Sequence, residues 1–330
     1  MVAREYAWAD KTRTDLYSPA SHASLLRILP SPFQHRRAEG YSLCTLDVSD
    51  AYLQVDQVIP AVICIITGGV RRYFLLLKCL PGQRDGSCLR YQKFIVTLQE
   101  VGGAELLDEC PSVFRWPQGG GGLVHVDDML SAAMRALLDA IVEKIKLRFK
   151  VSVTFLDRPG DELYFLKRRH FLHNDVLLIQ PHPKHVQNLC RILGLTSTSK
   201  VKETPLPTGP SPIDLDVRPL DPERSGMFRT CVGILLYLAA DVHPAQYGIK
   251  VLAQQMSAPT EGGLKCLKHL ASYLRGTASH AVALEPPTSG CGVIVQDGQD
   301  GKELLELYTD SDWNGDKQSR RSTSSSYLFL

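Results

Sequence analysis

The stretch LVHVDDMLS, residues 123–131, places two aspartates side by side between apolar residues. The residues around the pair alternate between apolar and polar, which is typical of a half-buried β-strand. Because aspartate is a favoured turn residue, the pattern predicts a β-hairpin with Asp127 and Asp128 at its tip. A tight turn is also the geometry that could aim both carboxylates toward one point, since neighbours on a regular strand point to opposite faces.

A third carboxylate follows from a second stretch, YSLCTLDVSDAYLQV, residues 41–55. Its alternation predicts a strand that ends near Asp47 and runs into a turn or helix from Ser49. Three carboxylates within a few ångströms repel one another strongly unless divalent cations lie among them, and oxygen ligands favour Mg²⁺ or Mn²⁺. Two such ions about 4 Å apart would support in-line phosphoryl transfer. A solvated acidic turn without a metal is the alternative interpretation.

The composition is that of a folded globular protein with room for two or three compact units. The chain has 330 residues, of which 44% are hydrophobic and 22% charged. The net charge of +2 is too small to indicate a nucleic-acid partner, so such a partner has to be argued from local sites. Nine cysteines without any C-x-x-C pair favour reduced thiols over a disulfide framework or a zinc ribbon.

Membrane association is not expected. The longest apolar run, VIPAVICIIT at residues 58–67, is far shorter than the roughly 20 residues that cross a bilayer, and it predicts a buried strand instead. No cationic start followed by an apolar run indicates a secretory signal.

The remaining pattern mixes strands and helices and predicts an α+β fold. We expect a short helix from Ser21 to before Pro30, a hairpin made by strands at 62–67 and 71–80, and helices at 87–101 and 135–150. Two strands are expected within 162–180, a proline-rich linker over 203–222, helices at 227–242 and 262–277, and a strand-turn-strand pattern over 290–313. The run Gly119–Gly122 lacks the Lys-Ser/Thr of a phosphate loop and predicts a turn.

Several motifs together resemble a known family. TLDVSDAYLQV (45–55) and HVDDML (125–130) resemble the two catalytic motifs of retroelement reverse transcriptases. LPGQRDGSCLRY (80–91), the segment from Phe228 to Thr260, LASYLRGT (270–277) and the final segment from Tyr308 resemble, in this order, the copia-type Pol polyprotein of LTR retrotransposons. The resemblance covers nearly the whole chain from VAREYAW (2–8) onward.

This resemblance implies a right-hand polymerase with palm and fingers, a mixed antiparallel sheet and a helical connection. Asp47, Asp127 and Asp128 would hold two Mg²⁺ or Mn²⁺ ions, and Tyr52 would lie beneath the sugar of the incoming nucleotide. Gln83 would also touch that sugar. The implied partners are an RNA or DNA template with its primer and deoxynucleoside triphosphates. The implied location is intracellular, in a cytoplasmic particle or the nucleus.

The last segment resembles the start of a ribonuclease H domain, with Asp310 in the place of its first metal-binding aspartate. The implied division is a reverse transcriptase domain over 1–208, a linker and helical connection over 209–302, and an incomplete ribonuclease H-like segment over 303–330. The other acidic ligands of that domain, and the basic residues with which the fingers grip the triphosphate, would lie outside this sequence. His125 replaces the usual tyrosine, which we expect to change how the primer end is held, and YFLKRRH (164–170) replaces a stretch that commonly reads Phe-Leu-Gly.

These features lead to one main hypothesis, that the chain is a fragment of a retrotransposon polyprotein with RNA-directed DNA polymerase activity, a nucleotidyltransferase. The first alternative is an inactive relict that keeps the fold and weak nucleic-acid binding. The second is an unrelated metal-dependent hydrolase.

Overall fold

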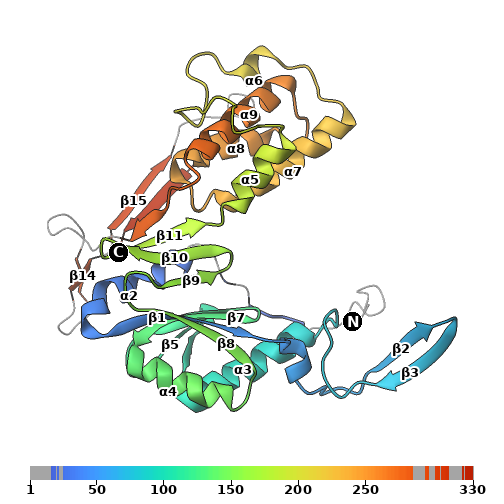
Figure 1. Ribbon diagram of the computed structural model, residues 1–330, viewed down its shortest axis with the longest axis vertical. Coiled ribbons are helices and arrows are strands. Elements are labelled where there is room, and N and C mark those ends of the chain that lie inside the picture. Colours follow the sequence, from blue (N-terminus) through green and yellow to red (C-terminus); the bar gives the residue numbers. More distant parts are fainter. Residues whose placement is uncertain are drawn as a thin grey trace.

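The computed structural model describes residues 16–19, 21, 25–284 and 322 with their side chains, and the backbone of short strands within 294–329. The element order mixes helices and strands, and each sheet is antiparallel (Figure 1). The expected α+β class is therefore confirmed.

A six-stranded antiparallel sheet carries both acidic motifs. Its order is β4-β5-β6-β7-β1-β8. The strands are β1 (Tyr41–Val48), β4 (Glu105–Leu107), β5 (Cys110–Arg115), β6 (Gly121–His125), β7 (Asp128–Met134) and β8 (Val151–Leu156). The predicted hairpin is confirmed as β6–β7, but its tip is Val126 and Asp127, and Asp128 is already the first residue of β7. Strand β1 lies beside β7 although more than seventy residues separate them in sequence.

Two helices cover one face of this sheet. They are α3 (Gly86–Gly102) and α4 (Arg135–Lys146), close to the predicted ranges. Cys44, Leu46 and Val48 of β1 pack with Phe94 and Leu98 of α3 in one buried cluster. Since side chains alternate along a strand, the odd-numbered residues of β1, Asp47 included, lie on the other face.

The other face of the sheet packs on short helices and on a second sheet. Helices α1 (Leu25–Ile28) and α2 (Ser31–Arg36) and the 3₁₀ turn η1 (Arg37–Glu39) precede β1. The second sheet has the order β12-β11-β10-β9, with strands β9 (Glu162–Phe165), β10 (Arg168–His173), β11 (Val176–Pro181) and β12 (Val282–Leu284). Three strands therefore fill 162–180, not the two that were predicted, because non-glycine residues Leu166 and Lys167 adopt positive φ and form an additional tight turn.

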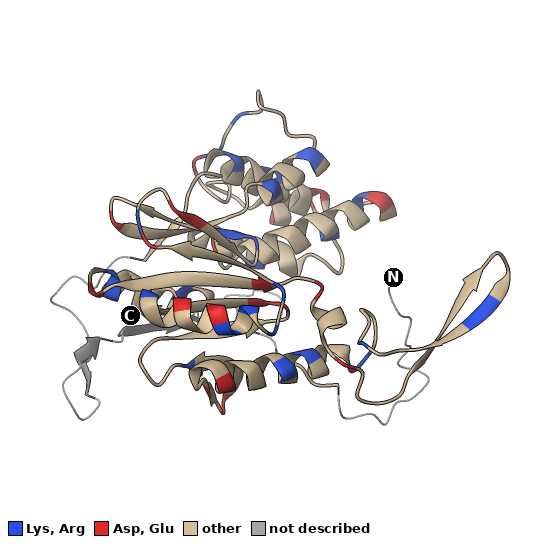
Figure 2. Cartoon of the chain, turned by 60° about the horizontal axis from the view of Figure 1, so that its bottom comes forward, with Lys and Arg blue, Asp and Glu red and all other residues tan. Residues whose placement is uncertain are grey.

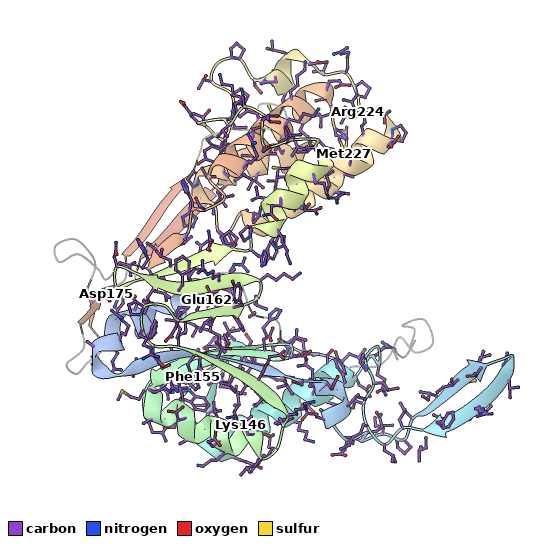
Figure 3. The ribbon with its side chains drawn as sticks, in the orientation of Figure 1. Lys146, Phe155, Glu162, Asp175, Arg224 and Met227 are labelled. Atoms are coloured by element: carbon purple, nitrogen blue, oxygen red, sulfur yellow. The ribbon has the colours of Figure 1, made fainter. Side chains whose placement is uncertain are left out.

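A helical unit follows the second sheet (Figure 1). It contains α5 (Lys184–Ile192), α6 (Pro212–Leu215), α7 (Pro222–Leu238), η3 (His243–Ala245), α8 (Gln246–Gln254) and α9 (Glu261–Gly276). Its buried core joins Leu189 of α5 with Phe228 of α7 and Leu267 of α9. In Figure 3 Arg224 and Met227 lie in this unit, whereas Lys146 and Phe155 lie in the part formed by the six-stranded sheet. The division of the chain at residue 208 stays a prediction.

The hairpin at 62–75 forms, but the expectation of a buried strand there was wrong. Strands β2 (Val62–Thr67) and β3 (Val70–Leu75) pair only with each other and project from the rest of the chain (Figure 1). Gly68 and Gly69 both have positive φ, as a two-residue type I′ turn requires. Every residue of β3 is exposed, including its basic pair Arg71 and Arg72 (Figure 2).

The glycine run makes the predicted turn. Gly120 has a φ of +86° between β5 and β6, and Gly122 lies in β6, where a Cβ atom would stand 2.4 Å from the carbonyl oxygen of Leu130 and 2.6 Å from Phe114. The glycines therefore have a packing role, since close backbone approach leaves no space for a side chain.

The chain's last strands are described by their backbone alone. They are β13 (Ile294–Gln296), β14 (Lys302–Leu304), β15 (Glu306–Ser311) and β16 (Ser324–Phe329), paired as β13–β14 and β15–β16. Asp310 lies on β15 opposite Ser325, but its side chain falls outside the described residues, as does the segment 2–8. Among the described residues, no helix has the length and apolar character needed to span a membrane.

Candidate active site

Two of the three predicted carboxylates lie opposite each other on neighbouring strands. In the register of β1 and β7, Asp47 pairs directly with Asp128. Directly opposed residues share one face of a sheet with their Cβ atoms about 5 Å apart, so the two carboxylates are close neighbours. Ser152 on β8, on the other side of Asp47, donates a long hydrogen bond of 3.5 Å to Oδ2 of Asp47.

The third carboxylate, Asp127, lies in the two-residue turn between β6 and β7. The first turn residue, Val126, has a φ of +57°, which is unusual for a β-branched side chain. A positive φ at this position matches a type II′ turn, in which glycine is the usual residue. The strained turn thus places Asp127 next to Asp128 without putting both in a regular strand.

Asp127 is turned toward an arginine that the sequence analysis did not single out. Oδ1 of Asp127 lies 2.6 Å from Nη1 of Arg90 on α3, although the angle is not that of a hydrogen bond. Arg90 occupies a position in the buried stripe of α3 that also contains Phe94, Leu98 and Val101. An arginine in the apolar stripe of a helix is the sequence signal by which this residue could have been found, because an ion is rarely buried without a partner.

The crowding of the carboxylates changes how they bind protons. Burial, the neighbouring Asp47 and then Asp127 raise the pKa of Asp128 to about 6, while Arg90 acts in the opposite direction. Burial also raises the pKa of Asp127, and Arg90 opposes this shift more strongly than Asp47 supports it. The charged form of Asp128 is therefore unfavourable in the absence of a cation.

The donor set fits a divalent cation between Asp47 and Asp128. Two opposed carboxylates on rigid neighbouring strands supply hard oxygen ligands. Burial and then the charge of Asp47 raise the pKa of Asp128, and a bound cation would favour its charged form. Across the residues described with side chains, however, no three His, Cys, Asp or Glu side chains are arranged so as to hold a metal ion together. In this conformation Asp127 faces Arg90 instead.

Tyr52 lies beside the carboxylates, in the 3₁₀ turn η2 (Ala51–Gln54) that follows β1. Its hydroxyl is 2.9 Å from Oγ of Ser87, and its ring lies 5.4 Å from Cζ of Arg90, within the range of a cation–π contact. A Cβ atom on Gly86 would stand 2.9 Å from the ring. The start of α3 therefore fixes the ring next to the acidic turn.

Gln83 is held inside its own loop. Its Oε1 accepts a hydrogen bond from the backbone N–H of Leu80, and its Nε2 donates to Oε1 of Gln57 at 3.0 Å. These bonds shape the turn before α3 and use one donor and one acceptor of the side-chain amide.

His125 ends β6 and pairs with Asp128 across the turn. Its Nδ1 lies 2.6 Å from Oγ of Ser21. Burial and then the positive charge of Arg90 lower the pKa of His125, so the neutral imidazole is favoured at neutral pH.

A surface groove of about 640 Å³ lies elsewhere on α3, where it is lined by residues that include Leu89, Lys93 and Val96. None of the predicted site residues lines it. The acidic turn is therefore not part of this groove.

Comparisons with known proteins find retrotransposon polyproteins among the relatives of this chain. The chain is 28% identical to the retrovirus-related Pol polyprotein from transposon RE1 and 25% identical to that from transposon RE2, both of Arabidopsis thaliana, over 96% of its own length. It spans only 20% of the length of each of these polyproteins. An uncharacterized mitochondrial protein of Arabidopsis thaliana, AtMg00810, is 27% identical over 63% of this chain and 78% of that protein. No family model matches the chain.

The fold has a counterpart among solved structures. A foamy viral protease-reverse transcriptase in complex with dsDNA superposes with a TM-score of 0.51 at 13% identity, covering 99% of this chain and 58% of that one. The likeness supports the expected reverse transcriptase fold. The sequence relatives confirm the resemblance to a retrotransposon Pol polyprotein and are consistent with the copia type.

Proposed function

Because this chain is homologous to the retrovirus-related Pol polyproteins of transposons, we propose that it is a reverse transcriptase segment, an RNA-directed DNA polymerase that joins deoxynucleoside triphosphates to a primer on an RNA or DNA template. The observation that carries the proposal is the direct pairing of Asp47 with Asp128 across β1 and β7, beside the turn that holds Asp127. This pairing brings together carboxylates from two motifs more than seventy residues apart.

Asp47 and Asp128 would hold a divalent ion, Mg²⁺ or Mn²⁺, and Asp127 would help to hold a second. The ions would lower the pKa of the primer hydroxyl and neutralise the charge that develops on the leaving pyrophosphate. The chain's own contribution is position, because the ladder of β1 and β7 fixes two of the carboxylates before any substrate arrives. Residue Asp310 on β15 would belong to a separate ribonuclease H centre.

Tyr52 would lie under the sugar of the incoming nucleotide and exclude a ribose 2′-hydroxyl by steric contact. The packing of its ring on Gly86 and its hydroxyl contact with Ser87 support this role, since a selective wall has to be rigid. Gln83 would contact the same sugar from the turn before α3. The loop bonds of Gln83 leave one amide N–H and one lone pair of Oε1 for such a contact.

The template-primer duplex would be held mainly through its phosphates, without reading of its bases, so binding should weaken steeply as salt rises. The exposed basic pair on β3, Arg71 and Arg72, lies on the projecting hairpin (Figure 2) and would contribute to such contacts. We place such activity inside the cell, in a cytoplasmic particle or the nucleus.

The first test is primer extension with Mg²⁺ on a homopolymer template. We expect incorporation by the unchanged chain, and a loss of at least about a hundredfold in Asp47→Asn, because a ligand of the reacting centre is removed. Asp108→Asn is the matched control, since Asp108 is an exposed aspartate in the turn between β4 and β5 of the same sheet. Incorporation that persists in Asp47→Asn would refute the metal assignment.

Two observations favour the alternative of an inactive relict. The ion pair between Asp127 and Arg90 and the internal bonds of Gln83 occupy two of the proposed functional side chains. If the unchanged chain binds a primer-template duplex but does not extend it with Mg²⁺ or Mn²⁺, the relict is the correct assignment.

A further inference from the structure

Arg90 is the most deeply buried charged side chain at the acidic turn. Only 4% of its side chain is exposed, and it reaches from α3 to within 2.6 Å of Asp127. Its Nε and Nη2 atoms have no hydrogen-bond partner among the described residues. A guanidinium is fully charged in a protein, so burying it requires a counter-charge, and Asp127 supplies it.

The position of Arg90 is fixed from three sides. The backbone of α3 holds its Cα, the ring of Tyr52 lies 5.4 Å from Cζ, and Asp127 lies at its tip. Its charge is held at the acidic turn, where its Nη1 atom lies 2.6 Å from Oδ1 of Asp127. Arg90 therefore acts on this centre as a fixed positive charge.

The three carboxylates consequently divide into two groups. Asp47 and Asp128 face each other across β1 and β7 without a cationic partner in the part of the chain described with side chains, whereas Asp127 is paired with Arg90. The same division is reflected in the absence of any described group of three side chains that could hold one metal ion.

We propose that Arg90 is an internal counter-ion that occupies the place of a divalent cation at Asp127. The chain alone then binds a single divalent ion at Asp47 and Asp128, and a second ion reaches Asp127 only by displacing Arg90. The inference rests on the proposed function for the choice of cation, and it makes Arg90 a positioning residue that sets the metal occupancy of the centre.

The physical reason is competition for one carboxylate. An incoming cation at Asp127, whose side chain is 37% exposed, has to break the ion pair with the buried guanidinium of Arg90. The guanidinium is then left without its counter-charge, and both changes oppose binding. At Asp47 and Asp128 the cation meets two carboxylates that repel each other, so binding there removes an unfavourable contact. Removal of the charge at residue 90 should therefore strengthen binding of cations at Asp127.

The test measures Mn²⁺ binding to the whole chain by titration calorimetry, in the absence of nucleotide and nucleic acid. Arg90→Met keeps the length of the side chain and removes its charge. We expect one Mn²⁺ on the unchanged chain, and in Arg90→Met either a second ion or affinity raised by about tenfold, the usual size of coupling between interacting sites. Arg90→Lys keeps the charge and should bind as the unchanged chain does.

The double variant Arg90→Met/Asp127→Asn identifies the carboxylate responsible. The gain should vanish in it, while Asp127→Asn alone should leave the single ion of the unchanged chain in place. Two results would overturn the inference: Mn²⁺ binding in folded Arg90→Met that equals the unchanged chain, or loss of the single ion in Asp127→Asn.

A metal-free measurement separates this inference from the proposed function. Asp127→Asn leaves Arg90 buried without a counter-charge, so its melting temperature should fall, and Arg90→Met in the same chain should restore it. If the unchanged chain binds no Mn²⁺ but the melting temperatures follow this order, the metal assignment fails and the ion pair stands. If Asp127→Asn has the same melting temperature as the unchanged chain, Arg90 does not depend on Asp127 and the counter-ion role is wrong. This result can be read even if Arg90→Met fails to fold, because it needs only the Asp127→Asn variant.

Discussion

Arg168 on β10 and Asp241, just after α7, form a buried ion pair that ties the second sheet to the helical unit. Nε of Arg168 lies 2.9 Å from Oδ1 of Asp241, Nη2 lies 2.9 Å from Oδ2, and neither side chain is more than 6% exposed. The two residues of this bidentate pair lie 73 positions apart in the chain, so the pair depends on the tertiary structure.

We predict that Asp241→Asn lowers the free energy of unfolding by about 3–5 kcal/mol, because it leaves the guanidinium of Arg168 buried without its counter-charge. Urea denaturation followed by circular dichroism measures this. Glu105→Gln, which breaks the exposed pair between Glu105 and Arg115, is the control and should cost no more than about 1 kcal/mol. Equal effects of the two substitutions would contradict the prediction.

His170 predicts how stability depends on pH. It is completely buried on β10, and burial lowers its pKa from 6.5 to about 4. The unfolded chain therefore takes up a proton at this residue before the folded chain does, so this contribution to stability is present above about pH 6.5 and is lost as the pH falls toward 4. His170→Phe should lose less stability between pH 7 and pH 4.5 than the unchanged chain.

The comparison for His170 is best made as a difference between the two chains at each pH, since other groups titrate in the same range. His269→Phe is a suitable second comparison, because burial lowers the pKa of that histidine too but the side chain is much less enclosed. A pH dependence that is identical in His170→Phe and the unchanged chain would remove His170 as its source.

The exposed hairpin predicts self-association. Val62 and Ile66 on β2 and Tyr73 on β3 are each more than 60% exposed. The hairpin therefore presents apolar surface on two strands that pair with each other and leave their outer edges free. Replacing Val62 and Ile66 with threonine, which keeps the preference for strands, should lower light scattering at high protein concentration without changing the melting temperature. The same double substitution should not alter scattering if the hairpin takes no part in association.

Gly122 tests the account of the glycine run. Alanine at this position would place its Cβ against the carbonyl oxygen of Leu130 and the ring of Phe114, so Gly122→Ala should destabilise the chain by about 1–3 kcal/mol. Gly160→Ala is no fair control because Gly160 has positive φ, whereas Gly233 in α7 has open space around it and a helical backbone. Gly233→Ala should be neutral or stabilising by up to about 1 kcal/mol.

The sequence by itself determined the local elements that carry the acidic motifs. The alternation around residues 123–131 predicted the β6–β7 hairpin, the alternation up to Asp47 predicted β1, and the apolar spacing over 87–101 predicted α3. Each of these patterns depends on neighbours in the chain, so periodicity was enough to find them. The motifs also indicated the family, because their order along the chain does not depend on folding.

Only the tertiary structure decided which side chains meet. The register of β1 on β7 places Asp47 opposite Asp128, and the docking of α3 places Arg90 at Asp127. It also leaves Val62 and Ile66 of β2 exposed, although the apolar run at residues 58–67 predicted a buried strand. The periodicity of apolar residues predicts which side of a strand or helix is buried. Which residue lies against that side depends on strand register and helix docking, and these are set by contacts between segments far apart in the chain.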